Sequence, residues 1–136
     1  VRATLDGLAT ALATERINED ELKELRHIQT QLENYVEKSN LQGVIKKDIE
    51  FHDVIYKASK NDKLVQIANN LREQVYRFRV IYLKDFGNNE EVIREHNEIW
   101  SAILSKDPNL ARVSAQKHIK SQESAILNAI KRSNLI

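Results

Sequence analysis

Hydrophobic residues recur along most of this chain at intervals of three and four positions, the spacing that places them on one face of an α-helix. After Asn18, for example, the apolar positions run in this rhythm from Leu22 to Val36. Polar breaks such as KASKND and FGNN separate one such segment from the next. The pattern predicts six helices: residues 2–16, a second helix capped by Asn18, and residues 41–59, 62–85, 90–105 and 108–132.

Local signals support three of these boundaries. Asn18, followed three residues later by Glu21, forms a capping-box pattern in which each side chain accepts from the backbone N–H of the other. Asp107 before Pro108 predicts the start of the last helix, because proline fits the first helical position. Gly87 in FGNN suits a left-handed residue after a helix.

The composition agrees with an all-helical chain. Of 136 residues, only three are glycine and one is proline, and so few breakers favour long helices. This length favours one domain with a sizeable core, and short connections make consecutive helices antiparallel neighbours. We therefore expect an all-α fold, an antiparallel bundle of about six helices that residues 1–136 form as a single domain.

Charge and cysteine content exclude several function classes. The net charge of +1 gives no support for a nucleic-acid or membrane-binding surface. Without cysteine the chain has no disulfide, no thiolate nucleophile and no sulfur-ligated metal. No apolar run approaches the ~20 residues of a membrane span, and no signal peptide is visible. A cytoplasmic location is the expectation.

Candidate chemistry lies in the histidines, which occupy different helix faces. Asp48 and His52 are four residues apart, share one face, and lie on the apolar stripe of their helix. His96 falls inside the apolar stripe of residues 90–105, and His118 shares a face with small residues. His27 points away from its stripe, so we expect it to be solvated. Three histidines and one carboxylate therefore face a shared interior.

Two interpretations of this interior set remain open. Burying an unpaired carboxylate costs several kcal/mol, and a divalent cation would remove that cost. Three imidazoles and one carboxylate suit Zn, Ni, Mn or Fe. An inward histidine is, however, often only a hydrogen-bonded core residue, and Asp48 with His52 also fits a simple structural pair.

The sequence resembles the FCD domain, the C-terminal sensor domain of one branch of GntR-type bacterial transcription regulators. The resemblance extends over essentially the whole chain. It is carried by VRATLDGLATALATERIN, DIEFHDVIYKASKN, REHNEIWSAILSKDPNLA and AQKHIKSQ.

The resemblance implies a helical bundle with a metal and ligand cavity inside. The metal ligands that it implies are Asp48, His52, His96 and His118, holding one divalent ion, with zinc as the first expectation. It also implies a small organic acid effector bound beside the metal, a homodimer, and control of operator DNA through an N-terminal winged helix-turn-helix domain. We expect this chain to be the sensor domain alone, without that DNA-binding domain.

An organic acid needs cationic donors, and arginine offers a bidentate fork to a carboxylate. Arg2 lies at the margin of the first apolar stripe, and Arg79 flanks the stripe of residues 62–85. Tyr82 is on the inward face, and Gln122 follows His118 by one turn. We take Arg2, Arg79, Tyr82 and Gln122 as candidate effector-binding residues. Arg72 is expected to be solvated, and each of the others also has a purely structural interpretation.

Two metalloenzyme classes fit the sequence less well than this sensor. The pair His52-Asp53 resembles that of HD-type metal-dependent hydrolases, but Asp53 lies ~100° from His52 and leaves the stripe. A ferritin-like di-iron site needs two inward Glu-x-x-His segments, and Glu24 with outward His27 is the one example here. An HD-type hydrolase and a metal-free dimerisation module remain as alternatives, and we expect no enzyme.

Overall fold

The computed structural model describes residues 1–86 and 89–134. Six α-helices and one short π-helix account for nearly all of them, so the predicted all-α class is confirmed. In chain order these elements are α1 (Arg2–Arg16), α2 (Glu19–Glu37), α3 (Leu41–Ala58), α4 (Asp62–Ile81), η1 (Tyr82–Phe86), α5 (Asn89–Leu104) and α6 (Pro108–Asn134). Among the described residues, no helix combines the length and the apolar character needed to cross a membrane.

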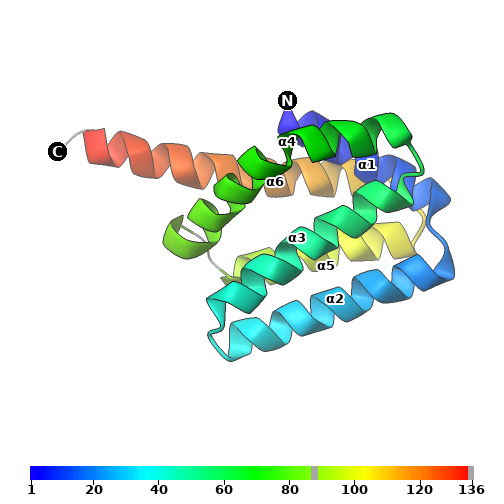
Figure 1. Ribbon diagram of the computed structural model, residues 1–136, viewed down its shortest axis with the longest axis horizontal. Helices are drawn as coiled ribbons and strands as arrows, with labels where there is room; N and C mark the ends of the chain where they lie inside the picture. Colours follow the sequence, from blue (N-terminus) through cyan, green and yellow to red (C-terminus); the bar gives the residue numbers. More distant parts are fainter. Residues whose placement is uncertain (87–88, 135–136) are drawn as a thin grey trace.

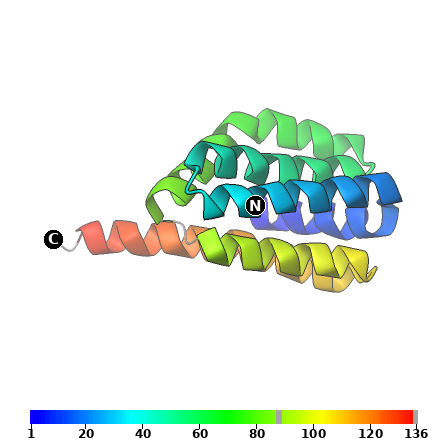
Figure 2. The same ribbon diagram turned by 90° about the horizontal axis from the view of Figure 1, so that it is seen from below.

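The helices pack as a bundle in which consecutive long helices run antiparallel (Figure 1). Helix α2 packs along α3, while α1 and α5 both pack along α6. Seen from below, α4 lies at one outer side, α5 and α6 lie at the other, and α1 to α3 lie between them (Figure 2). The C-terminal half of α6 projects beyond the rest of the bundle in both views.

Asparagine and aspartate side chains cap the N-termini of most of these helices. The Asn18 and Glu21 capping box is present in both directions, as predicted. Asp107 accepts from the backbone N–H of Leu110 at 3.1 Å, which confirms the predicted start of α6. Asn40 and Asn61 cap α3 and α4 in the same way. Such caps typically contribute ~1 kcal/mol each.

Helices α2, α3 and α5 end without glycine. The residues that follow them, Ser39, Lys60 and Lys106, have positive φ values of 55°, 54° and 58°. A left-handed residue is the usual way to close a helix, and glycine is its usual occupant. Because these positions hold other residue types, the ends were predicted from polar breaks rather than from a terminating glycine.

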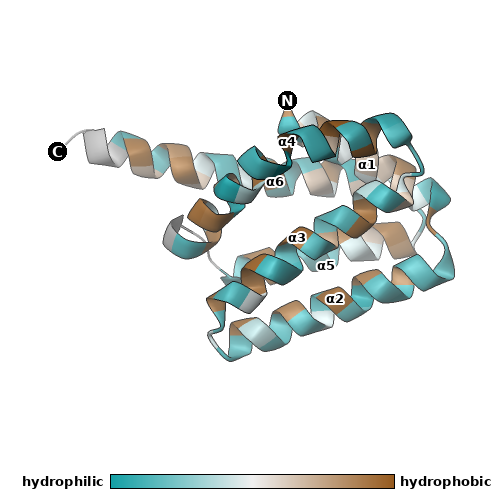
Figure 3. Ribbon diagram, in the orientation of Figure 1, coloured by the Kyte–Doolittle hydropathy of each residue, from teal (hydrophilic) through white to brown (hydrophobic). Residues whose placement is uncertain are grey.

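Hydrophobic and hydrophilic residues alternate along the helices (Figure 3), and the buried hydrophobic side chains form two clusters. The larger cluster joins α1, α2, α3, α5 and α6 and includes Leu25, Phe51 and Ile103, each 0% exposed. Full burial of such side chains contributes roughly 1.5–3 kcal/mol each. The smaller cluster comprises Val44, Ile45, Tyr82, Leu83 and Val92. On α3, Asp48 lies between the residues that enter the two clusters, and His52 follows Phe51 of the larger cluster.

The fourth helix differs from its predicted span of residues 62–85. Its α-helical part ends at Ile81, and a π-helix follows over Tyr82–Phe86. Tyr82 and Leu83 are both buried, at 2% and 4% exposure. Adjacent residues of a regular α-helix point ~100° apart, and the wider π turn lets both side chains enter the smaller cluster. The predicted turn at Gly87 lies outside the described residues.

Candidate metal centre

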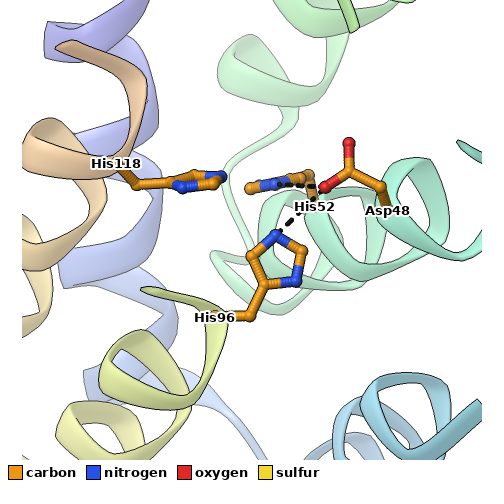
Figure 4. Close-up of side chains that lie close together, drawn as sticks. All are labelled: Asp48, His52, His96 and His118. Carbon is orange, nitrogen blue, oxygen red and sulfur yellow. Dashed lines mark ion pairs between the residues drawn. The ribbon is translucent and has the colours of Figure 1, made fainter. Parts of the chain in front are cut away.

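Three helices bring four buried side chains to one point in the bundle. Asp48 and His52 extend from α3, His96 from α5 and His118 from α6, and they point toward one another (Figure 4). One potential ligand atom from each lies within 4.8 Å of all the others. Exposure is 1% for Asp48, 7% for His52, 0% for His96 and 1% for His118. The structure thus brings together all four residues singled out from the sequence.

The shortest contact in the cluster is between a ring nitrogen of His96 and a carboxylate oxygen of Asp48. Nε2 of His96 lies 3.0 Å from Oδ1 of Asp48, and Nε2 of His52 lies 3.6 Å from the same oxygen. Two ligands of one tetrahedral zinc, each at ~2.1 Å, would stand ~3.4 Å apart. These two separations therefore suit a shared ion. Ligand atoms of the cluster that lie farther apart, up to 4.8 Å, would have to move closer together to bind the same ion.

Gln29 determines which nitrogen of His96 carries the proton. The Gln29 amide donates from Nε2 to the carbonyl of Ile93 at 3.3 Å, which orients its oxygen toward His96. That oxygen, Oε1, lies 3.0 Å from Nδ1 of His96, so Nδ1–H donates to it. A neutral His96 then presents the bare lone pair of Nε2 to the Asp48 carboxylate. Only a cation between them, a metal ion or a proton, makes this contact favourable.

Glu95 likewise determines which nitrogen of His118 carries the proton. Its Oε1 lies 3.0 Å from Nδ1 of His118, and both side chains are buried. Nδ1–H donates to this oxygen, so the lone pair of Nε2 faces the cluster, where the amide nitrogen of Gln122 lies 3.5 Å from it. Neither Glu95 nor Gln29 was predicted from the sequence. The available signal was position, because Glu95 precedes buried Ile99 by four residues and shares its face.

The pKa values favour the protonation states that metal ligands need. Burial raises the pKa of Asp48, but contact with the His52 and His96 rings and the charge of Arg79 lower it by more, to well below its usual range. Burial, and then the charge of Arg79, lower the pKa of His52 well below its usual value. Burial also lowers the pKa of His96, despite the adjacent Asp48. A proton on Nε2 of His96 is therefore disfavoured, and the chemistry of the donor set fits a divalent metal.

A cavity of about 270 Å³ adjoins the cluster and shares His52 with it. Arg79, which is 5% exposed, lines this cavity and also contacts Asp48 of the cluster. Its Nη1 donates to the backbone oxygen of Asp48 at 3.3 Å and lies 3.6 Å from Oδ2 of the same residue. The cavity is lined from α1, α3 and α4 by Arg2, Leu5, Asp6, Ile49, His52, Asp53, Tyr56, Ala68, Leu71, Arg72, Val75, Tyr76 and Arg79.

Arg2 brings unsatisfied donors to this cavity. Its three guanidinium nitrogens are buried and have no hydrogen-bond partner among the described residues. The guanidinium lies over the ring of Phe78, 4.9 Å from its centroid. Burial and the nearby charge of Arg79 lower the pKa of Arg2 to about 10, so it stays cationic at neutral pH. Each unsatisfied buried donor costs ~1–3 kcal/mol, which an anion in the cavity would offset.

Asp6 and Tyr56, which the sequence did not single out, complete the polar end of the cavity. The Tyr56 hydroxyl donates to Oδ1 of Asp6 at 2.5 Å. Burial, and then the charge of Asp6, raise the pKa of Tyr56, so the hydroxyl keeps its proton. Asp6 is 5% exposed. The site therefore contains a fixed negative charge as well as the two arginines.

The remaining predicted residues lie elsewhere. Tyr82 belongs to the smaller hydrophobic cluster and is not among the residues that line the cavity. Gln122 is also outside that lining; its Nε2 is 3.5 Å from Nε2 of His118, so it adjoins the four-residue cluster instead. Arg72 is exposed at the edge of the cavity, where it forms a bidentate pair with Asp53 at 2.8 and 3.3 Å.

The arrangement around His52 bears on the hydrolase alternative. In the HD pattern both adjacent residues serve the metal, but here Asp53 is exposed and bound to Arg72. Glu24 and His27, the single Glu-x-x-His segment noted for a di-iron site, are both exposed. Asp48 and His52, which are four residues apart, are the pair that belongs to the cluster.

Comparisons with known proteins agree with this architecture. In sequence the chain is 22% identical over 122 residues to the uncharacterized HTH-type transcriptional regulator YdhC of Bacillus subtilis (strain 168), covering 87% of the chain and 53% of that protein. The fold is similar to that of E. coli McbR/YncC, with a TM-score of 0.81 at 20% identity over 95% of the chain and 62% of that protein. It is also similar to a Streptococcus agalactiae GntR protein, with a TM-score of 0.75 at 25% identity over 91% of the chain and 56% of that protein.

The chain spans about half to three fifths of the length of these relatives. The family model of the FCD domain matches residues 1–121. This match confirms the resemblance seen in the sequence motifs. With nearly the whole sequence matched, the chain belongs to the FCD domain family.

Proposed function

We propose that this chain is the metal-containing sensor domain of a GntR-type transcription regulator, and that it binds a small organic acid beside the metal. The observation that carries the proposal is the contact between Nε2 of His96 and Oδ1 of Asp48, 3.0 Å apart in a buried site. Both atoms lack a hydrogen-bond partner among the described residues. A divalent ion shared with His52 and His118 satisfies both atoms without placing a proton on a buried imidazole.

Zinc is the first choice for this ion, and Ni, Mn or Fe would also accept three imidazoles and a carboxylate. When bound, the ion would supply positive charge and a coordination position for an anionic oxygen. Gln29 and Glu95 orient His96 and His118 so that their Nε2 atoms face the ion.

The charges around the cavity support an anionic ligand that depends on the metal. Arg2 and Arg79 carry two positive charges, and Asp6, Asp48 and Glu95 carry three negative ones, so the formal charge is −1 without an ion and +1 with a divalent one. A divalent ion leaves this buried site with excess positive charge. A carboxylate then offsets that excess and satisfies the buried nitrogens of Arg2.

The B. subtilis relative is an HTH-type transcriptional regulator by name, and the chain matches only part of each relative. We therefore propose that effector binding alters how a homodimer presents N-terminal winged helix-turn-helix domains to operator DNA in the cytoplasm. In this function the acid is bound and released unchanged, so the domain is not an enzyme. An HD-type hydrolase would instead consume its ligand.

The test is calorimetric titration of small carboxylic acids into the zinc-loaded protein, followed by recovery of the ligand. We expect at least one acid to bind, and Arg2→Gln to weaken it about tenfold or more through loss of a charge-assisted contact. Arg77→Gln, an exposed arginine of α4, is the matched control and should leave affinity unchanged. Failure of every acid to bind, or chemical conversion of the acid, would contradict the sensor.

A further inference from the structure

The cavity beside the metal cluster has two chemically distinct parts. Its polar end contains Arg2, Arg79, His52 and the Asp6–Tyr56 pair. The rest of the lining is mainly apolar and comes from Leu5 of α1, Ile49 of α3, and Ala68, Leu71 and Val75 of α4. Tyr76 and the paired Arg72 and Asp53 complete it. A ligand that satisfies both parts must join one anionic group to a hydrocarbon body.

We infer that the effector is a monocarboxylate with an apolar tail of about four to seven carbons, rather than a short polar dicarboxylate or tricarboxylate. This inference rests on the proposed acid-sensing function and specifies its ligand class. The carboxylate lies at the Arg2 end, and the tail lies along Leu71 and Val75. The size follows from the cavity of about 270 Å³, because a cavity of about 150 Å³ holds benzene, with about six non-hydrogen atoms, and the space here thus matches roughly ten.

Helix α4 provides the first argument for a tail. Only two of its twenty side chains, Leu64 and Arg79, are buried. Leu71 and Val75 are half-buried and face the cavity. A hydrocarbon tail would bury this apolar surface, and each added methylene would strengthen binding about fourfold, which is ~0.8 kcal/mol of transfer free energy.

The lining charges provide the argument for a single carboxylate. The three cationic residues of the lining are Arg2, Arg79 and Arg72. Arg72 is already held by both oxygens of Asp53. A second carboxylate at the far end of the ligand would lie against Leu71 and Val75 with no free cation to receive it. Desolvating an unpaired carboxylate is costly, so a dicarboxylate of equal length should bind more weakly.

Four probes of matched structure separate these contributions. Hexanoate carries one carboxylate and a tail, adipate adds a second carboxylate at the other end of the same chain, acetate lacks the tail, and hexan-1-ol lacks the carboxylate. Each is titrated into the zinc-loaded protein at pH 7.5. We expect hexanoate to bind at least tenfold more tightly than each of the other three.

A variant of the apolar wall localises the tail. Val75→Thr keeps the shape of the side chain but places a hydroxyl against the tail, so hexanoate should bind about fivefold more weakly while acetate is unaffected. Val65→Thr makes the same change at a half-buried position of α4 outside the lining. This control should bind hexanoate like the wild type, and circular dichroism confirms that both variants are folded.

The outcomes distinguish this inference from the function on which it rests. Equal or tighter binding of adipate or acetate would overturn the apolar-tail class while leaving an acid sensor in place. Equal binding of hexan-1-ol would remove the carboxylate requirement and both proposals. Equal losses in Val75→Thr and Val65→Thr would contradict the placement of the tail along α4.

Discussion

Oε1 of Glu95 lies 3.0 Å from Nδ1 of His118, and both side chains are almost completely buried. This contact fixes the imidazole so that its other nitrogen faces Asp48, His52 and His96. A buried carboxylate in this position is typical of residues that orient a metal-ligating histidine. The contact joins α5, which also carries His96, to α6.

Glu95→Gln should therefore weaken metal binding without removing a ligand. The amide no longer provides a charged acceptor for Nδ1–H, and loss of such a partner typically costs 10–100-fold in metal affinity. Zinc affinity is measured by competition with a chelating dye. Glu98→Gln, three residues along α5 on an exposed side chain, should retain wild-type affinity. Equal affinity in both variants would show that Glu95 does not act on the site.

Arg79 should matter most to the metal-free protein. Its guanidinium balances the buried Asp48 carboxylate, and removing one partner of a buried pair typically costs ~3–5 kcal/mol. Arg79→Met should lower the free energy of unfolding by about that amount in chelator, measured with urea, and by less in zinc. Arg72→Met breaks the exposed pair with Asp53 and should cost at most ~1 kcal/mol. Similar costs for the two variants would contradict the role of Arg79.

Acid should destabilise the metal-free protein from about pH 6.5 downward. The pKa values of His52 and His96 are lowered in the folded state, by burial first, so the unfolded chain binds protons at a pH where the folded chain does not. The free energy of unfolding therefore falls as pH drops through the unfolded value of ~6.5, by up to ~1.4 kcal/mol per pH unit for each group. Urea unfolding between pH 7.5 and 5.5 measures this slope.

His52→Gln removes one of the two groups, so its stability should depend less steeply on pH, whatever its stability at pH 7.5. An unchanged slope would contradict the assignment of this pH dependence to His52. The comparison is made in chelator, because a bound metal adds its own proton competition.

Helical phase predicted the cluster well because Asp48, His52 and His96 lie on apolar stripes and His118 lies on a face of small residues. Asp48, His52, His96 and His118 had to face the interior, and the structure brings one potential ligand atom of each within 4.8 Å of the others. The helical phase shows that a side chain faces inward, but it does not show which cluster or cavity the side chain enters. Tyr82 faces inward as expected, but the π turn carries it into the smaller hydrophobic cluster instead of the cavity.

Tertiary partners were beyond the reach of the sequence. Gln29 and Glu95 are polar residues on helices with many polar residues, and only the packing of α2, α5 and α6 shows that they contact His96 and His118. The π turn was missed because five residues are too few to alter the hydrophobic period. The Asp6–Tyr56 hydrogen bond joins residues fifty positions apart, and no local pattern reports such a contact.

The central claim, a metal held by Asp48, His52, His96 and His118, is tested most directly by the metal content of the protein. The chain is incubated with zinc, freed of unbound ion by dialysis, and analysed by mass spectrometry beside His96→Ala and the exposed control His27→Ala. We predict about one zinc per chain in the wild type and in His27→Ala, and a large loss in His96→Ala. Wild-type protein that retains no zinc, or His96→Ala that retains as much as the wild type, would contradict the account.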